Sequence, residues 1–457
     1  MNLDETISQL GLTDFRDALT PSWPASQAAL PPTGPFFLRP AFVAAACEAA
    51  FLPAEPMVAA LAGAERIAAR PALATLAWYF YWCLWESPTF DQNQKSQWPA
   101  LAQVPAELAG DLAMIYLLAM LARYPQMEEV HRAHDVSRQI AEHTLMDIQL
   151  GGWTALHEQY GEWGLDRPRL HWLSYHFRGE IYRLGRLQFQ YGPFHAPLRV
   201  FQHRETGKIL ALSQSGVRYL ADGRLWSESR EAEGVAQASK PASGAGDSQA
   251  WKPALPYWTA ELTSSSGKSE DPSCALCGAI ITGHPITARG LARREPAELT
   301  CTEWWQVLAP GDPVLHLHIP VGGPMDHAEC GESMRWAAQW FPEHFPEWPY
   351  EAYCCNSWLL DTQLQEFLPP ESNIARFQRE MYLFPTITSD QNLLGPIFEC
   401  MPEFTAATPR KTALQRALGD YLEAGNKLRA SGGGCFILKD DLDWGGEVYL
   451  RGKALYG

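Results

Sequence analysis

Two closely spaced histidines, His316 and His318, are the side chains best placed to carry out chemistry. They alternate with aliphatic residues, which is typical of a strand. Alternate strand residues point to the same face, so both imidazoles would share one face of a sheet. The other face would carry Leu315, Leu317 and Ile319, which we expect to lie in the core.

Pro320 follows these residues and should end the strand, or open it away from its neighbour, because proline has no N–H for a sheet ladder. A histidine at such a strand end can accept a proton near neutral pH. His318 is therefore the first candidate for a general base, and His316 is the second. The alternative is structural, with one histidine hydrogen-bonded inside the sheet and the other half exposed.

A glycine loop, Val321-Gly322-Gly323, comes next and precedes a helix expected over Met325–Phe341, with Asp326 and Glu329 as cap and capping partner. Glycines let a ligand approach the backbone, and free N–H groups at a helix start bind anions. However, residues 321–334 contain no Lys or Arg, and the two acids already place negative charge there. A tight turn without a ligand is the alternative.

Two polar clusters could suggest metal sites. Cys274 and Cys277 have the spacing of half a zinc site, without a second pair of matching spacing. Glu128, His131 and His134 share one helical face, but a carboxylate-bridged metal site needs a second Glu-x-x-His. We therefore predict no metal and interpret the helical cluster as a solvated polar face.

A thiol nucleophile is a further alternative. Cys354 or Cys355 could act with His318 and Asn373, although adjacent cysteines in a buried strand are more often core residues. No G-x-S-x-G elbow is present. We interpret Ser372 first as the cap of a helix that carries Arg376 and Arg379 in its first turns.

The composition is that of a globular protein: 457 residues, 46% hydrophobic and 19% charged, with a net charge of −16. So acidic a chain is not expected to bind nucleic-acid phosphates. The first residues carry acid where a signal peptide needs base, and no apolar run is long enough to span a bilayer. The ten cysteines are scattered, as in reduced proteins. We expect a soluble cytoplasmic protein.

Residues 1–150 form a helical N-terminal domain by pattern, because apolar residues recur at helical spacing and prolines open several segments. Gly151-Gly152 would close the last helix. Helices are expected over Pro40–Phe51, Pro53–Ala69, Ala72–Trp85, Pro105–Arg123 and Gln126–Gln149.

Residues 151–457 form the second domain, which contains a flexible insertion at about 228–272 rich in Ala, Ser and Gly. The strand near 314 and the strand near 353 should pair in parallel, because a helix connects them. The fold class is α/β (α+β). Helices are expected over Leu170–Arg183, Trp304–Leu308, Met325–Phe341, Gln363–Met381 (in two pieces around Pro369-Pro370) and Lys411–Arg429, and strands over Arg186–Tyr191, Leu198–His203, Ile209–Ser213, Val314–Ile319, Tyr353–Leu360 and Cys435–Lys439.

The order of these elements resembles the GNAT acyltransferase fold. Several segments are similar to bacterial proteins that join a helical N-acyltransferase N-terminal domain, acting as a substrate or lid domain, to a GNAT-like C-terminal domain; glycopeptide-antibiotic N-acyltransferases are more distantly similar. The segments are L-H-I-P (317–320), G-G-P-M (322–325), C-x-x-S-M (330–334), F-P-E (341–343), C-N-S-W-L-L-D (355–361) and S-N-I-A-R-F-Q (372–378).

The resemblance implies an N-acyltransferase with an acyl-CoA donor and an amine acceptor. The two parallel strands would diverge around the pantetheine arm, backbone N–H groups near Ile319 would polarise the thioester, and His318 would take the proton of the amine. The residues implied for the donor are Ile319, Val321, Gly322, Gly323, Met325, Asn356, Arg376 and Arg379, and for catalysis His318 and His316.

This loop departs from the usual Q/R-x-x-G-x-G/A pattern, since it reads P-V-G-G-P-M and lacks the basic residue. Arg376 and Arg379 are alternative sources of positive charge, or the donor could be bound to an acyl carrier. The main rival is a degenerate GNAT-like ligand-binding or scaffold protein without turnover. A thiol hydrolase that uses Cys354 or Cys355 is a third alternative.

Overall fold

The computed structural model describes residues 1–88, 92–148, 156–157, 161–214, 217, 219, 223–224, 280–320, 322–386, 393–398, 404–428 and 432–457. The predictions for Gly151-Gly152, the 228–272 insertion, Cys274, Cys277 and Val321 lie outside the described residues. Within the described part, no helix combines the length and apolar character needed to cross a bilayer.

The chain forms two compact units. Unit 1 contains Met1–Gln190 with two short later segments, Ile319–Gly323 and Glu343–Phe345. Unit 2 contains the remaining residues from Tyr191 to Gly457. The domain division at residue 150 stays a prediction, and the first compact unit continues past it to Gln190.

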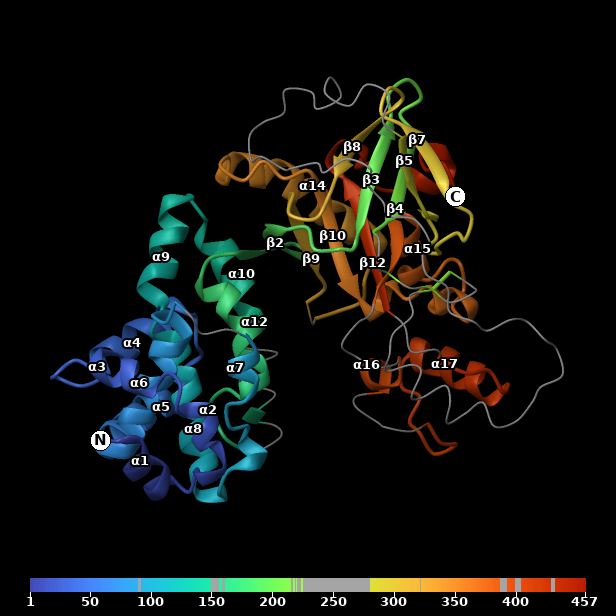
Figure 1. Cartoon of the computed structure of the whole chain (residues 1–457). Helices are drawn as coiled ribbons and strands as arrows, with labels where there is room; N and C mark the ends of the chain where they lie inside the picture. Colours follow the sequence, from blue (N-terminus) through green and yellow to red (C-terminus); the bar gives the residue numbers. More distant parts are fainter. Residues whose placement is uncertain are drawn as a thin grey trace. The chain divides into compact units, whose positions relative to one another are not determined.

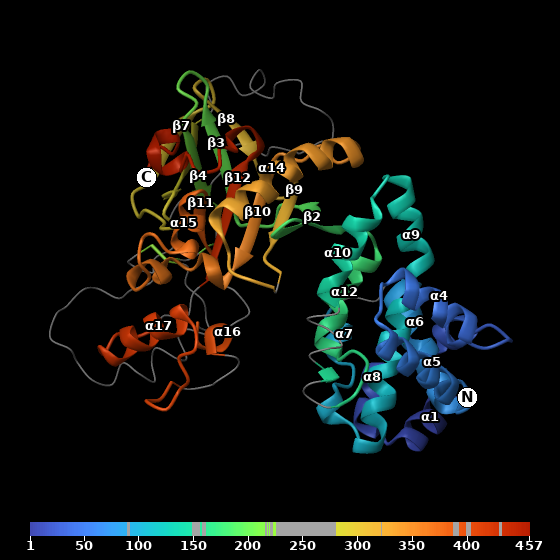
Figure 2. The same cartoon turned by 180° about the vertical axis from the view of Figure 1, so that it is seen from behind.

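Unit 1 is built mainly from helices (Figures 1 and 2). The predicted helical N-terminal region is confirmed, and prolines occupy the first turn of several helices as the sequence indicated. The helices are α1 (Leu3–Leu10), α2 (Arg16–Leu19), α3 (Trp23–Ala28), α4 (Pro40–Ala49), α5 (Ala54–Ala68), α6 (Pro71–Trp85), α7 (Gln92–Ser96), α8 (Ala106–Leu121), α9 (Tyr124–Ala133), α10 (Arg138–Ile148) and α12 (Arg167–Phe177).

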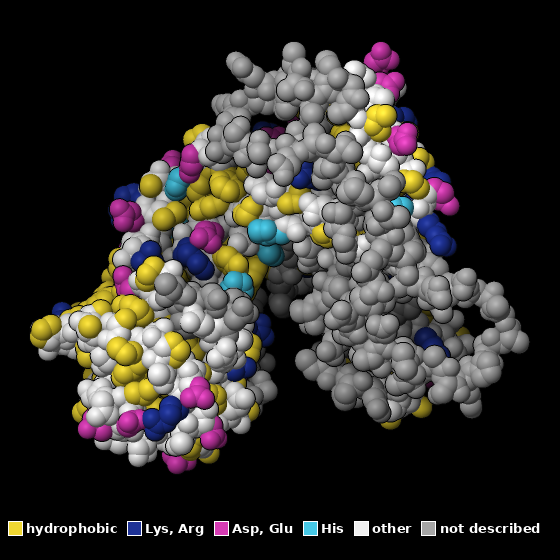
Figure 3. Space-filling model, viewed as in Figure 1, with side chains coloured by type: hydrophobic (Ala, Val, Ile, Leu, Met, Phe, Trp, Pro, Cys, Tyr) yellow, Lys and Arg dark blue, Asp and Glu magenta, His cyan; other side chains and the backbone are white. Residues whose placement is uncertain are grey.

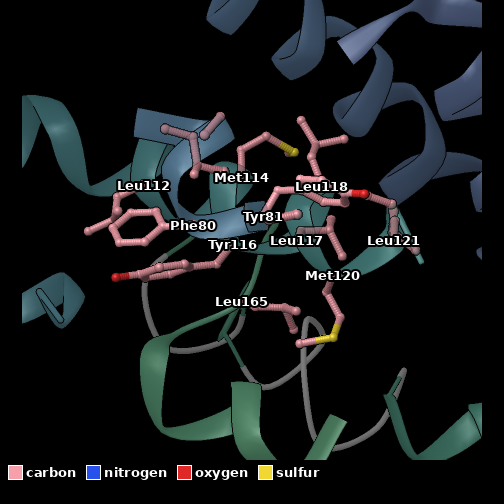
Figure 4. Packing of buried hydrophobic residues seen from close by; sticks show 14 of the residues in the cluster. Phe80, Tyr81, Leu112, Met114, Tyr116, Leu117, Leu118, Met120, Leu121 and Leu165 are labelled. Carbon is pink, nitrogen blue, oxygen red and sulfur yellow. The ribbon is translucent and has the colours of Figure 1, made fainter. Parts of the chain in front are cut away.

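Helices α6 and α8 form the centre of this unit because they are apolar on nearly every side. Phe80 of α6 packs on Tyr116 of α8 with ring centroids 4.9 Å apart, and Figure 4 shows both within the buried cluster. Asp111 of α8 is buried and forms ion pairs with Arg66 at 2.6 Å and Arg70 at 2.7 Å. The carboxylate therefore ties α5, and the residue that precedes α6, to α8.

Two predicted helices in this unit end earlier than expected. The segment Gln126–Gln149 is two helices, α9 and α10, separated at Asp135 with φ +48°. Helix α12 stops at Phe177 because Gly179 adopts φ +68°, a left-handed conformation that ends helices. The end of the expected helix Leu170–Arg183 is instead strand β1 (Ile181–Leu184), which pairs antiparallel with β2 (Leu187–Pro193).

We expect unit 1 to lose stability in acid. Burial lowers the pKa of His131, His171 and His176 from 6.5 to about 4 in each case. The unfolded chain then binds protons more readily, so this stability is fully present above pH 6.5 and is lost as the pH falls towards 4. For His176, which is 1% exposed, the loss is about 1 kcal/mol at pH 5.5.

Urea unfolding followed at pH 7.5 and pH 5.5 checks this expectation. The loss of stability between the two pH values should be smaller in His176→Asn, which cannot titrate, and should persist in the control His195→Asn, which replaces an exposed histidine of unit 2. Equal stability of the wild-type protein at both pH values would contradict it.

Unit 2 contains two main sheets. The strands of the larger one that lie wholly in this unit have the order β9-β10-β12-β11, and the smaller sheet has the order β6-β4-β3-β8 (Figure 1). A separate antiparallel pair joins β5 and β7. The strands after β2 are β3 (Leu198–His203), β4 (Ile209–Ser213), β5 (Ile280–Gly283), β6 (Pro285–Ile286), β7 (Ala297–Thr300), β8 (Trp304–Leu308), β9 (Pro313–His318), β10 (Ala352–Ser357), β11 (Tyr382–Thr386) and β12 (Gly432–Leu438).

The predicted parallel pairing of the strands near 314 and 353 is confirmed as β9 and β10. Helix α14 (His327–His344) connects them and runs close to both in the two views (Figures 1 and 2). The remaining helices of this unit are α15 (Asn373–Arg379), α16 (Leu394–Phe398) and α17 (Ala413–Glu423).

One predicted helix, Trp304–Leu308, is wrong. The segment is strand β8 and pairs antiparallel with β3, with a register shift between Val200 and Phe201. Trp304 and Leu308 are buried, and their spacing of four residues imitates a helical period, whereas the tertiary pairing favours the strand.

The predicted strand Tyr353–Leu360 is shorter than expected. Strand β10 ends at Ser357, whose hydroxyl accepts a hydrogen bond from the Leu359 N–H and starts a 3₁₀ turn. The helix expected over Gln363–Met381 is divided around Pro369-Pro370 as predicted, but its first piece is a 3₁₀ turn (Thr362–Glu366) and only Asn373–Arg379 is α-helical. The predicted cap of that helix is confirmed, because the Ser372 hydroxyl accepts from the Ala375 N–H at 3.3 Å.

The glycine run of β12 has a packing role. A Cβ at Gly433 would lie 1.9 Å from the carbonyl oxygen of Leu360, and one at Gly434 would lie 2.1 Å from the Phe384 ring. These two positions therefore admit only glycine without movement of their neighbours. The close approach brings β12 against the turn that ends β10.

Candidate functional site

The parallel pair β9 and β10 separates part-way along its length. Their register runs from Val314–Ala352 to His316–Cys354 and stops there. Strand β9 continues to His318, and β10 continues to Ser357 with its other edge paired to β12. Beyond the last pair, the facing edges of the two described strands carry backbone N–H and C=O groups, and another extended chain could form hydrogen bonds with them.

Strand β9 presents its residues as the alternation predicted. Leu315 and Leu317 are buried, whereas His316 and His318 are partly exposed and share the opposite face. Ile319 is only partly buried, so its expected place in the core is wrong. His318 is the last residue of the strand and lies beyond the final pair with β10.

His316 is held in one tautomer by two contacts. Its Nε2 lies 3.0 Å from the Pro193 carbonyl oxygen, which can only accept, so Nε2 carries the proton. Its Nδ1 lies 3.2 Å from the Cys354 Sγ and accepts from that thiol. Burial lowers the pKa of His316, and nearby His195 lowers it further, while the Pro193 hydrogen bond raises it. The side chain is therefore neutral and fixed within the sheet.

The cysteines of β10 have the character of core residues. Cys354 and Cys355 are both buried, as the sequence suggested. Burial raises the pKa of Cys354 well above 9 and that of Cys355 to about 12, so both remain protonated thiols near neutral pH. A nucleophilic cysteine needs the opposite environment, one that stabilises a thiolate. The geometry therefore disfavours a thiol mechanism.

Asn356 lies on β10 two residues after Cys354 and on the same face as the histidine pair. It is exposed and is directly opposite Gly434 of β12. A Cβ at Gly434 would lie 2.7 Å from the Asn356 Oδ1, so the glycine leaves room for this amide. One sheet face thus carries His316, His318 and Asn356 around the point where the strands separate.

The glycine loop after β9 belongs to unit 1, where it is held by the β1–β2 hairpin. Arg186 donates through Nη1 to the Pro320 carbonyl at 3.0 Å and through Nη2 to the Gly323 carbonyl at 2.9 Å. Gly322 and Gly323 have φ values of +118° and +117° and are exposed. These values favour glycine, because other residues would be strained there.

The start of α14 is capped by protein, as predicted. The Asp326 carboxylate accepts from the Ala328 N–H at 2.9 Å and the Glu329 N–H at 3.1 Å. The helix terminus is therefore already supplied with negative charge. Met325, which was expected to meet the donor, is buried and contributes to packing.

Arg376 and Arg379 take part in contacts within unit 2. Arg376 Nη2 lies 3.1 Å from the His327 Nδ1, and the His327 Nε2 lies 2.8 Å from a Glu380 carboxylate oxygen. Arg379 pairs with Glu447 at 2.8 Å and also donates to the Pro370 carbonyl at 2.6 Å. The contacts of Arg379 indicate that it is a structural residue. Arg376, in contrast, is exposed and makes a single described hydrogen bond.

The sequence did not single out Arg183, Arg186 or His327. Arg186 follows Gly185 in the turn between two strands, and such a position is normally solvated. Nothing in the local pattern shows that the loop more than 130 residues later packs against it. His327 did not stand out in the sequence because it directly follows the capping aspartate at the start of a helix. On the face drawn in Figure 3, acidic and basic side chains are interspersed among the described residues.

Two family models match the chain. An N-acyltransferase N-terminal domain matches residues 16–179, and a GNAT-like C-terminal domain matches residues 181–435. A search of curated proteins found no significant match to the sequence. The two family matches together span most of the protein.

Solved structures with a similar fold include an acyltransferase in complex with decanoyl-CoA and teicoplanin, at 20% sequence identity and a TM-score of 0.55. A mutant acyltransferase in complex with octanoyl-CoA is similar at 19% identity and a TM-score of 0.55. Each alignment covers 96% of this chain and 99% of the other. At these identities the likeness concerns the fold. Because the C-terminal model alone spans more than half of the sequence, the chain belongs to the family of proteins with a GNAT-like C-terminal domain, and it carries the N-acyltransferase N-terminal domain before it.

Proposed function

We propose that this protein is an N-acyltransferase that moves an acyl group from an acyl-CoA thioester to an amine. The observation that carries the proposal is the separation of β9 and β10 after His316 and Cys354. A pantetheine arm is an extended chain with amide groups, so it can pair with the strand edges beyond this point as an added strand would. The related structures in complex with octanoyl-CoA and decanoyl-CoA support a donor of this class.

In this proposal His318 is the general base. It stands at the end of β9 beyond the last strand pair, on the face that also carries Asn356. The amine nitrogen attacks the thioester carbonyl carbon, and His318 takes the ammonium proton directly or through water. The carbon–sulfur bond then breaks, and the CoA thiolate leaves and is protonated.

His316 has a supporting role in this scheme. Because its two ring nitrogens are occupied by Pro193 and Cys354, it is not available to exchange a proton with the acceptor. It fixes β9 against β10 at the last pair before the strands separate. Asn356, which lies on the same face, would form hydrogen bonds with the amide groups of the donor.

Thermal unfolding with added ligand tests the proposal. CoA or a medium-chain acyl-CoA at 100 times its Kd should stabilise the fold by about 2.7 kcal/mol, which raises Tm by several degrees. Mixing acyl-CoA with a panel of primary amines should release free thiol. If no CoA or acyl-CoA of any chain length changes Tm, the donor assignment is wrong. Stabilisation without thiol release would favour the rival, a ligand-binding protein without turnover.

A further inference from the structure

The loop after β9 lacks the basic residue usual for phosphate loops. A hairpin distant in sequence places two arginines beside it, because Arg186 bonds two of its carbonyls and Arg183 comes close to Gly322. The hairpin consists of β1 and β2, and its turn contains Gly185 and Arg186. Both the hairpin arginines and Ile319–Gly323 belong to unit 1. The contact is therefore part of a single compact body.

Arg186 fixes the shape of the loop. Its guanidinium bridges the carbonyls of Pro320 and Gly323, which are three residues apart in sequence. Arg186 is only 8% exposed, so water competes little for these hydrogen bonds. The planar guanidinium holds two acceptors in fixed directions, which a lysine ammonium cannot reproduce. This contact holds the glycine pair in its left-handed conformation.

Arg183 brings a second charge to the same place. Its backbone N–H donates to the Thr144 hydroxyl of α10 at 2.9 Å, and its Nε donates to the Gly185 carbonyl at 3.3 Å. Its Nη2 lies 3.8 Å from where a Cβ on Gly322 would be. Arg183 is 6% exposed, so its guanidinium lies beneath the exposed glycine. A charge shielded in this way acts at closer to full strength than a surface charge.

We propose that Arg183 and Arg186 replace the basic residue missing from the loop, so that Gly322 and Gly323 receive a phosphate group of the thioester donor. Arg186 is the positioning residue that shapes the loop, and Arg183 supplies the positive charge beneath Gly322. This inference rests on the proposed function, because it assigns a part of the same donor.

The test measures binding of CoA, phosphopantetheine and pantetheine by calorimetry to the full-length protein. Arg186→Lys keeps the positive charge but loses the planar guanidinium that bonds two carbonyls at once. Arg183→Gln removes the charge at that position and leaves the loop contacts of Arg186 in place. Each variant should weaken CoA binding by roughly 10–100-fold, the effect of one charge-assisted hydrogen bond. Pantetheine, which has no phosphate, should bind each variant as it binds the wild type. The matched control is Arg178→Gln, at the end of α12 with partners Ser174 and Glu180.

The outcomes separate the inference from the proposed function. If the wild-type protein binds neither CoA nor pantetheine, the proposed function fails. The arginine assignment is overturned if the wild-type protein binds CoA and both variants bind it with the same affinity. It is also overturned if a variant loses affinity for pantetheine as much as for CoA. A loss limited to CoA places the nucleotide diphosphate at the loop, and a loss shared with phosphopantetheine places there the phosphate that a carrier-bound donor would also present.

A second measurement applies if a variant unfolds. Amide hydrogen exchange of the wild-type protein with saturating CoA should slow in the peptides that cover 181–187 and 319–324. Unchanged exchange in both peptides, with CoA demonstrably bound, would also overturn the assignment.

Discussion

Replacing His318 by alanine should lower kcat by roughly 10²–10⁴-fold, which is the usual contribution of a positioned general base. The fold should survive, since His318 is partly exposed at a strand end and alanine leaves no cavity in the core. The Kd of CoA should change little, because the donor is held by strand edges and loop. The measurement is the rate of steady-state thiol release.

His316→Gln is the matched comparison. That residue bridges Pro193 and Cys354, so its replacement should reduce Tm and lower kcat by less than about tenfold. A loss of less than about threefold in His318→Ala would demote His318 to a structural residue. A larger loss of kcat in His316→Gln than in His318→Ala would reverse the two assignments.

Replacing Gly433 by alanine should be the most destabilising of the small changes in unit 2, at about 3 kcal/mol. The added Cβ would meet the backbone carbonyl of Leu360 at 1.9 Å, and a backbone atom cannot rotate away as a side chain can. Either β12 moves from β10 or the 3₁₀ turn after β10 shifts. Urea unfolding monitored by tryptophan fluorescence gives the change in free energy of unfolding.

Gly425→Ala serves as the control for this change. Gly425 follows α17 with φ +85° and has open space around its Cβ position, so alanine there adds only backbone strain of about 1–2 kcal/mol. Equal losses at the two positions would show that the close approach of β12 and Leu360 contributes nothing of its own.

The sequence was sufficient to predict the elements whose pattern is local. Strands β3 and β4 have the predicted bounds, and helices α4, α5, α6 and α8 agree to within a few residues, because their apolar periodicity is uninterrupted. Where tertiary pairing competed with periodicity, the prediction failed. Trp304–Leu308 has helical spacing but becomes β8, because β3 offers it a partner.

The candidate site was predictable only in part. The shared face of His316 and His318 follows from strand geometry alone, and the resemblance implied that the strands diverge. The tautomer of His316 could not be predicted, since it depends on Pro193, more than 120 residues away. The contact of Arg186 with Pro320 and Gly323 is equally non-local, and the sequence pattern indicated only that Arg186 begins a strand.

Unit 1 is assembled from segments that lie far apart in the sequence, and this has a consequence for its synthesis on the ribosome. Met1–Gln190 emerges first, but Ile319–Gly323 and Glu343–Phe345 belong to the same compact body. At bacterial and eukaryotic elongation rates, roughly ten to thirty seconds pass between the emergence of Gln190 and of Phe345. During that interval the nascent helices fold without their last two segments. The turn that carries Arg186 lacks its loop until about half of the second unit has been translated.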